Sequence, residues 1–463
     1  MRSRNGDDPE LALRLSKDIE GRVIALGDPD YDDARAVFYG GIDRRPAAIA
    51  RVARDADVAR VIAEARETGL ELAIRSGGHS LVGHSVTEGG IVLDLSEMQA
   101  LDIDAESRTA WAESGVTAGR YSEAAAEHGL ATGFGDSPSV GVGGITLGGG
   151  VGFLVRKYGL TIDALLAADV VTAAGEVLRV DEESHPDLFW AIRGGGGNFG
   201  VATRFRFRLH EVPAIVGGIL ILPATLETIA GWAAASESAP EELSTIATVM
   251  KAPPMPFLPE AVHGKIVIFG MIVHAGGGEA GERAVTPFRE LAEPLGDMLK
   301  EMPYPGIYME EEGDFHPIAS DRTMFLDRVD EDVAARILDR ISSSDAMMAA
   351  AQFRVLGGAM ARVPADATAF AHRSSKIMVN VAALFESVED RPRYERWVQE
   401  FADVLRQKDQ GAYVNFLEDE GPERVRAAYP GATWDRLREI KRRYDPTNLF
   451  RLNQNIPPAD EDA

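Results

Sequence analysis

The first half of the chain alternates short apolar runs with segments whose apolar side chains recur at helical spacing. Residues 49–52 form one such run, typical of a buried strand, and the segment after it has helical periodicity. We expect Asp55 or Asp57 to cap the start of that helix and Gly69 to end it. Further strands are predicted over residues 70–74 and 91–95, and a further helix over residues 117–128.

More strands are predicted before and after the last glycine-rich stretch of this half. Residues 168–172 and 176–180 form a predicted hairpin. Residues 201–209 alternate between two sets of side chains, which is typical of a strand.

That last strand decides how one glycine motif is interpreted. Gly195, Gly197 and Gly200 match the G-x-G-x-x-G fingerprint of nicotinamide-binding domains, which requires a helix directly afterwards. Because a strand is predicted there instead, we reject the fingerprint. The sequence also contains no P-loop motif.

Beyond about Pro213 the segments become longer. Extended runs at residues 265–274 and 377–384 lie between helical stretches, which favours a second domain of antiparallel sheet with helices on one face. The predicted helices cover residues 286–299, 392–407, 422–429 and 433–444.

Composition narrows the possible functions. The 463 residues are 45% hydrophobic, which is enough for large buried cores. Asp and Glu number 73 against 48 Lys and Arg, and the formal charge of −25 would repel the phosphate backbone of nucleic acids. The chain has no cysteine, which excludes disulfides, thiolate metal ligands and cysteine nucleophiles. We expect no nucleic-acid partner and no metal site.

The start of the chain shows no targeting pattern. Residues 1–30 are interrupted by Asp and Glu every few positions and contain no apolar core of a signal peptide. No run of about 18 apolar residues occurs in the sequence. We therefore expect a cytoplasmic protein that does not cross a membrane.

Glycine is concentrated in two blocks, residues 133–152 and 193–200. Clustered glycines permit turns with positive φ and let backbone N–H groups approach a ligand closely. A third segment, residues 75–80, directly follows a predicted strand, where ligands usually bind in α/β units. Because nests of N–H groups hold a pyrophosphate without lysine, the three segments together favour a cradle for a phosphorylated, planar cofactor. A plain turn is the alternative for any single block.

Several motifs in a fixed order resemble the berberine-bridge-enzyme-like FAD-linked oxidases of the vanillyl-alcohol-oxidase superfamily. They cover residues 30–215 and 405–458. The motifs are Arg75-Ser-Gly-Gly-His-Ser80, Val140-Gly-x-Gly-Gly-x-x-x-Gly-Gly-Gly150, Tyr158-Gly-Leu160, Pro186-Asp-Leu-Phe-Trp190, Arg193-Gly-Gly-Gly-Gly-Asn-Phe-Gly200 and Tyr444-Asp-Pro-x-Asn448.

The resemblance implies an α+β fold of two domains. One is a PCMH-type FAD-binding domain of two α/β subdomains, residues 1–215 plus 425–463. The other is an inserted substrate domain, residues 216–424, with an antiparallel sheet covered by helices.

The resemblance also implies FAD as the cofactor, held by a single covalent bond. In the family, the histidine of the first motif bonds to the flavin 8α-methyl group, and that histidine is His79 here. A neutral imidazole is a suitable nucleophile, and a hydrogen-bonding loop histidine is the alternative. His84 is expected to be structural. The residues expected to bind the cofactor are Arg75, Ser76, Gly77, Gly78, His79, Ser80, Ser137, Val140, Gly141, Gly143, Gly144, Gly148, Gly149, Gly150, Gly197, Asn198, Phe199, Gly200, Val201, Asn453 and Asn455.

Two positions in the first glycine block bear on the flavin chemistry. Many relatives form a second flavin bond through a cysteine where this chain has Ser137, so the resemblance implies one attachment, as in bacterial members with a single histidyl bond. Val140 matches the position that gates oxygen in the family. A small side chain there resembles the oxidases and implies reoxidation by O₂, with ordinary packing as the alternative.

The catalytic base is where this chain departs from the family. Family members often place a tyrosine base in a Tyr-x-Asn-Tyr motif, but this chain reads Tyr413-Val-Asn-Phe416, and Phe416 cannot accept a proton. Either Tyr413, Asn415 or another group substitutes, or the substrate is an amine that needs no base. Tyr308 and His372 are further catalytic candidates, with structural roles as the alternative.

The resemblance implies an FAD-dependent oxidoreductase, an oxidase acting on a small organic alcohol, sugar or amine. Hydride transfer to flavin N5 would be followed by reoxidation by O₂, giving H₂O₂. Three alternatives stay open: a flavin dehydrogenase with another electron acceptor, a monooxygenase-like use of flavin and oxygen, and a flavin-binding scaffold without turnover. The acidic run at residues 310–314 is expected to be a solvated loop and would favour a cationic substrate.

Overall fold

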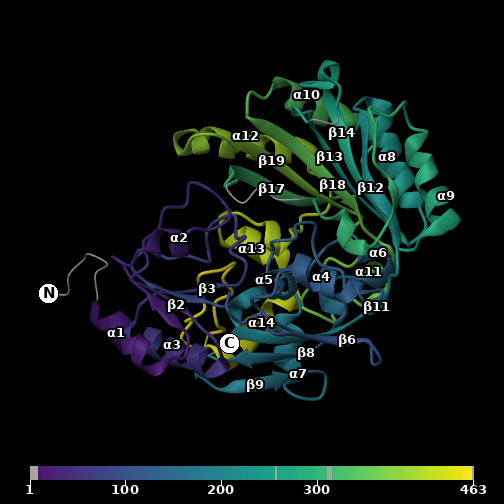
Figure 1. Ribbon diagram of the computed structural model, residues 1–463. Coiled ribbons are helices and arrows are strands. Elements are labelled where there is room, and N and C mark those ends of the chain that lie inside the picture. Colours follow the sequence, from purple (N-terminus) through teal and green to yellow (C-terminus); the bar gives the residue numbers. More distant parts are fainter. Residues whose placement is uncertain (1–8, 256–257, 310–314, 461–463) are drawn as a thin grey trace.

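The computed structural model describes residues 9–255, 258–309 and 315–460, so the acidic run at 310–314 lies outside the described residues. The first domain contains two main sheets (Figure 1). The smaller sheet has the strand order β1-β2-β4-β3, with β2 and β3 both parallel to β4. Its elements are β1 (Arg22–Ile24), β2 (Ala48–Arg51), β3 (Leu72–Arg75), β4 (Ile91–Asp94), α1 (Pro9–Asp18), α2 (Tyr31–Arg35) and α3 (Asp55–Thr68).

Helix α3 ends as predicted but starts differently. Gly69 has a φ of +68° and forms the left-handed cap that ends the helix. At the start, Arg54 is the capping residue, so the prediction of Asp55 or Asp57 is wrong. The buried Asp57 carboxylate instead accepts hydrogen bonds from three backbone N–H groups, two of which lie just before β1. This carboxylate therefore joins α3 to the chain that precedes it.

The second sheet of this domain is antiparallel, with the order β5-β6-β10-β8-β9. Strand β10 begins directly after Gly200, which confirms the predicted strand and the rejection of the nicotinamide fingerprint. The predicted hairpin is formed by β8 and β9. The elements are β5 (Leu101–Asp104), β6 (Thr109–Glu113), β8 (Leu165–Val171), β9 (Val177–Val180), β10 (Val201–Arg208), α4 (Ala118–Ala126), α5 (Val142–Leu147), α6 (Val155–Tyr158), α7 (Pro186–Ile192) and the short pair β7 (Leu130–Ala131) and β11 (His210–Glu211).

The second domain is built on an antiparallel sheet with the order β15-β12-β14-β13-β18-β19-β17, and β16 pairs with β12. Its longer helices gather on one side of the sheet, whereas the short helix at Gly358–Arg362 packs against the first domain (Figure 1). The strands are β12 (Ile215–Pro223), β13 (Leu243–Lys251), β14 (Ile266–His274), β15 (Gly296–Asp297), β16 (Lys300–Met302), β17 (Ile318–Leu326), β18 (Met348–Val355) and β19 (Ile377–Phe385). The helices are α8 (Leu226–Ser238), α9 (Gly278–Arg289), α10 (Glu331–Ser343), α11 (Gly358–Arg362) and α12 (Arg391–Leu405).

The predicted helix over residues 286–299 is wrong. Helix α9 ends at Arg289, and the chain then forms the edge strands β15 and β16. Pro294 has no N–H to continue a helix, and the N–H of Leu295 donates to the carbonyl of Ile221 on β12 instead. The strands predicted at 265–274 and 377–384 and the helix at 392–407 are confirmed as β14, β19 and α12.

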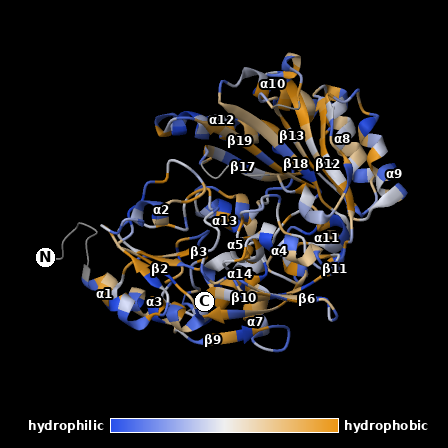
Figure 2. Ribbon diagram, in the orientation of Figure 1, coloured by the Kyte–Doolittle hydropathy of each residue, from blue (hydrophilic) through white to orange (hydrophobic). Residues whose placement is uncertain are grey.

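Strict alternation divides the large sheet into two buried faces. On β14, Ile268 and Ile272 pack in the core that includes the helices, whereas Phe269 and Met271 pack on the opposite face, in a cluster that includes Phe153 of the first domain. The strands are accordingly among the most hydrophobic elements of the fold (Figure 2). One face of the sheet is thus turned toward the first domain.

The chain returns to the first domain at its C-terminal end. Helices α13 (Pro422–Ala428) and α14 (Ala432–Tyr444) confirm the last two predicted helices, and Leu437 and Ile440 pack in the same core as Phe189 of α7. The predicted α+β architecture, with an antiparallel sheet covered by helices, is confirmed. Within the described part of the chain, no helix is both long and apolar enough to cross a membrane.

Candidate functional site

A cavity of about 590 Å³ lies between the two domains. The first domain lines it with the loop after β3, with both glycine blocks and with the segment after α14. The second domain contributes Met271 of β14, Asp321 of β17 and Met309, which precedes β17. Residues 413–417 complete the wall. Cavities between domains are common places for cofactors and substrates.

Glycine lets two cavity-lining backbones meet directly. A Cβ atom on Gly77 would lie 2.3 Å from the backbone N of Gly141, and one on Gly141 would lie 2.1 Å from Ser76 Oγ. The Ser76 hydroxyl donates to the carbonyl of Ser114 at 2.6 Å, and Gly78 turns the loop with a φ of +74°. The loop after β3 is therefore fixed against the first glycine block.

His79 lies in this loop and lines the cavity. Its Nε2 atom is 2.8 Å from Ser139 Oγ, and its ring stacks on Phe38 with the ring centroids 4.2 Å apart. These two contacts fix the orientation of the imidazole. His84 lines the same cavity, and burial lowers the pKa of His84 to about 4, so its ring is neutral near neutral pH.

Backbone and polar atoms are available to a ligand on the first-domain side. A Cβ atom at Gly144 or Gly197 would meet nothing within 4 Å, and both residues line the cavity. Asn453 Oδ1 and Ser85 Oγ, on two further lining residues, are buried without a hydrogen-bond partner among the described residues. Open backbone and unpartnered polar atoms fit a phosphorylated, planar cofactor such as FAD.

Asn198 joins the second glycine block to the end of the chain. Its side-chain amide donates to the carbonyls of Gly195 and Gln454, and its Oδ1 accepts from the N–H of Ile456 at 2.9 Å. Because this side chain is bonded on both sides, the segment after α14 is held over the cavity.

Most residues expected to bind the cofactor line the cavity. They are Ser76, Gly77, Gly78, His79, Ser80, Ser137, Val140, Gly141, Gly143, Gly144, Gly197, Asn198, Gly200, Val201 and Asn453. Six others stand outside the lining that the described residues form: Arg75, Gly148, Gly149, Gly150, Phe199 and Asn455. The role of each residue toward a cofactor stays a prediction.

Arg75 and Phe199 do not line the cavity but contact the segments that form its wall. The Arg75 guanidinium donates to the carbonyls of Ala34 and Ala36, so it holds the end of α2. Phe199 is fully buried in the hydrophobic core beneath the second glycine block. Asn455 Oδ1 is buried without a hydrogen-bond partner among the described residues.

The three consecutive glycines 148–150 lie beside Tyr413 and Asn415. A Cβ atom on Gly148 would lie 1.9 Å from Asn415 Oδ1. The Tyr413 hydroxyl oxygen accepts hydrogen bonds from the N–H groups of Gly150 at 3.0 Å and Val151 at 3.3 Å, and from Asn415 Nδ2 at 3.0 Å. Burial raises the pKa of Tyr413, while these three donors oppose the shift. Tyr413, Asn415 and Phe416 all line the cavity.

The other two catalytic candidates lie elsewhere. Tyr308 packs against Phe153 and Tyr304, and burial raises its pKa. The His372 ring is buried, its Nε2 lies 3.0 Å from the carbonyl of Ala428, and burial lowers its pKa. Both side chains stand outside the described lining of the cavity.

The sequence interpretation missed the wall that the second domain supplies. Asp321 and Met271 line the cavity from β17 and β14. Arg354 of β18 pairs with the lining residue Asp136 at 2.7 Å and donates to the carbonyl of Val151, so it ties the sheet to the first glycine block. The local sequence contains no signal for Asp321, because the polar residues at 320–323 are consecutive and do not alternate with apolar ones.

Comparison with known proteins agrees with this geometry. Residues 46–181 match the family described as FAD binding domain, and residues 412–457 match berberine and berberine like. The chain is 32% identical to an uncharacterized FAD-linked oxidoreductase, YvdP, of Bacillus subtilis, over 96% of this chain and 99% of that protein. It is also 32% identical to (R)-6-hydroxynicotine oxidase of Paenarthrobacter nicotinovorans, over 97% and 99%.

Solved structures agree with the sequence matches. The crystal structure of 6-hydroxy-D-nicotine oxidase from Arthrobacter nicotinovorans superposes with a TM-score of 0.82 at 28% identity, covering 95% of this chain and 98% of that one. Since the relatives match in sequence and fold over nearly their whole length, the chain belongs to the berberine-bridge-enzyme-like FAD-linked oxidoreductases of the PCMH/VAO FAD-binding superfamily.

Proposed function

We propose that this protein is an oxidase that oxidises a small organic alcohol, sugar or amine and passes the electrons to O₂, giving H₂O₂. The observation that carries the proposal is the shared cavity, in which a glycine cradle faces Met271, Asp321 and Phe416. Bound FAD supplies the hydride acceptor at N5. The relative named (R)-6-hydroxynicotine oxidase supports an oxidase acting on a small molecule.

The proposal includes one covalent bond, between the His79 imidazole and the 8α carbon of FAD. Its support is that His79 lines the cavity with its ring held by Ser139 and Phe38. Ser137 lies on the same wall, and because the chain has no cysteine, no thioether is available. Val140 also lines the cavity, which supports oxygen access.

On the substrate side of the cavity, this chain does not have the tyrosine that serves as the base in many family members. We propose that the residues there orient the substrate instead. Phe416 presents an apolar ring to the cavity, and the Tyr413 oxygen is surrounded by three hydrogen-bond donors. These donors favour a structural role for the Tyr413 hydroxyl, which holds the loop of Gly150, over a role as acceptor of a substrate proton. This arrangement favours a substrate whose oxidation needs no tyrosine base.

Anaerobic titration of the purified protein with a panel of amines, alcohols and sugars tests the proposal. We expect at least one compound to bleach the flavin absorbance, and admission of air to restore it rapidly with formation of H₂O₂. Slow recovery in air would select a dehydrogenase with another electron acceptor. If no compound of a broad panel reduces the flavin, the proposed enzymatic activity is contradicted. The remaining alternative is then a flavin-binding scaffold without turnover.

A further inference from the structure

Strand β17 presents one carboxyl group to the cavity. Met324 and Leu326 pack in the core that includes the helices, while Phe325 packs on the opposite face in a cluster with Tyr413. Asp321 has the same parity as Phe325 and lines the cavity. Its side chain thus faces the side of the sheet on which a substrate would lie.

Only one of the two carboxyl oxygens of Asp321 has a hydrogen-bond partner among the described residues. Its Oδ2 accepts a hydrogen bond from Asn380 Nδ2 at 3.0 Å, whereas its Oδ1 has no hydrogen-bond partner among the described residues. The residue is 8% exposed. A carboxyl oxygen buried in this way costs free energy unless a ligand pairs with it.

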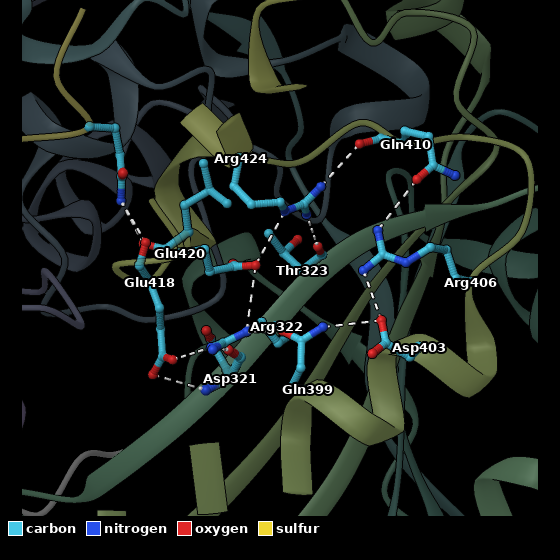
Figure 3. A network of polar contacts seen from close by, with 12 residues as sticks. Asp321, Arg322, Thr323, Gln399, Asp403, Arg406, Gln410, Glu418, Glu420 and Arg424 are labelled. Atoms are coloured by element: carbon cyan, nitrogen blue, oxygen red, sulfur yellow. Dashed lines mark hydrogen bonds and ion pairs between the residues drawn. The ribbon is translucent and has the colours of Figure 1, made fainter. Parts of the chain in front are cut away.

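The charged groups around Asp321 already neutralise one another (Figure 3). Arg322 pairs with Glu418 and contacts Glu420, and Arg424 binds Glu420 at 3.2 Å. Two carboxylates and two guanidinium groups therefore cancel. Glu418 also accepts the backbone N–H of Asp321 at 3.1 Å, so one of these two carboxyl groups lies directly beside the aspartate.

Within the described part of the chain, neither guanidinium forms an ion pair with the Asp321 carboxyl, because each donates to other acceptors. Arg322 Nε donates to Gln399 Oε1 at 3.1 Å, and Arg424 donates to the carbonyl of Thr323 at 2.9 Å (Figure 3). Burial, and then the Glu418 charge, raise the pKa of Asp321 well above its usual range. The first-domain residue Tyr39 and the carboxyl of Glu420 are the other titratable groups near it.

An organic cation would satisfy this site. With no cation bound, the raised pKa of Asp321 keeps its carboxyl protonated. A positively charged N–H donor supplies the missing hydrogen bond and a counter-charge, so that the carboxyl releases its proton and forms an ion pair. Met271 and Phe416 give the same cavity apolar surface for a carbon skeleton.

We propose that Asp321 binds the protonated nitrogen of an amine substrate through its free Oδ1 atom, with Met271 and Phe416 against the carbon skeleton. This inference rests on the proposed function and selects amines from its three substrate classes. Asp321 is thus the residue that determines specificity for a cation over a neutral alcohol.

The test compares ammonium ions with alcohols of the same skeleton. Butylamine, benzylamine and phenethylamine are titrated into the anaerobic holoenzyme beside butanol, benzyl alcohol and phenylethanol, and binding is followed by calorimetry and by perturbation of the flavin spectrum. We expect at least one amine to bind more tightly than its alcohol. In Asp321→Asn its affinity should fall roughly 30-fold and the alcohol affinity should stay within a few-fold.

Asp327→Asn is the matched control, since it removes the same charge from an exposed position just after β17 and should keep the preference. Thermal unfolding and flavin content establish that each variant is folded, and Asp321→Ser is the second variant should Asp321→Asn fail to fold. A wild type that binds no amine more tightly than its alcohol overturns the inference, as does a preference that survives removal of the Asp321 carboxyl.

Flavin reduction separates this inference from the proposed function. Reduction by alcohols or sugars, unchanged in Asp321→Asn, would overturn the role of Asp321 and leave the oxidase standing. Amine binding that depends on Asp321 without any flavin reduction would support the cation site and contradict turnover.

Discussion

Lys441 Nζ lies 2.7 Å from Asp445 Oδ2, and both side chains are completely buried. Lys441 also donates to the carbonyls of Asn198 and Phe450, while the Asp445 carboxylate accepts the N–H of Phe450. One buried ion pair at the C-terminal end of α14 thus holds the second glycine block and the segment after the helix together. Both of these lie at the wall of the cavity.

Lys441→Met should destabilise the protein by about 3 to 5 kcal/mol, because it leaves the Asp445 carboxylate buried without its counter-charge. Urea unfolding measures the change. Arg443→Met is the matched control: the Arg443 side chain is 66% exposed in its pairing with Asp187, so the loss of this pairing should cost at most about 1 kcal/mol. Equal losses in the two variants would show that the buried pair has no special role.

Tyr413→Phe should cost about 1 to 3 kcal/mol of stability, because the buried N–H groups of Gly150 and Val151 lose their acceptor. Tyr308→Phe is a fitting comparison, since that hydroxyl contacts the hydroxyl groups of Ser122, at 3.5 Å, and Tyr304 rather than buried backbone N–H groups. We expect less than about 1 kcal/mol there. If the Tyr413 oxygen only holds the loop, flavin reduction by substrate in Tyr413→Phe should also keep the wild-type pH profile. A shifted profile would instead identify Tyr413 as a proton acceptor.

Asp321 should make the stability of the substrate-free protein depend on pH. Its folded-state pKa is raised, so above the usual value of 3.8 the native state holds a proton that the unfolded chain has released. The free energy of unfolding therefore falls as pH rises toward the raised pKa. Asp321→Asn removes this part of the slope, so its stability relative to wild type should increase from about pH 5 to about pH 8. An offset that is the same at both pH values would contradict the assigned protonation.

The parts of the site that the sequence predicted are local in the chain. The loop after β3 and the glycines at 141, 143, 144 and 197 lie where strand ends and backbone geometry require them, so a motif alone locates them. Gly148, Gly149 and Gly150 belong to the same motif, yet they make room for Asn415, Phe370 and Thr161 rather than line the cavity. A glycine motif does not distinguish contact with a ligand from contact with another side chain.

The substrate wall could not be predicted because it depends on long-range strand pairing. Asp321 and Asn380 meet through the register of β17 and β19, and Glu418 reaches them from a loop after α12. The incorrect prediction of a helix over residues 286–299 has a similar cause. There the pairing of residues 295–302 with β12 replaced local helical spacing.

The central claim is that this cavity holds FAD through one bond to His79, and acid precipitation of the purified protein tests it most directly. We expect the flavin colour to stay in the washed pellet of the wild type and of Ser137→Ala, and to move to the supernatant in His79→Ala. Colour released from the wild type would contradict the covalent bond. A colourless protein that takes up no added FAD would contradict the cofactor site itself.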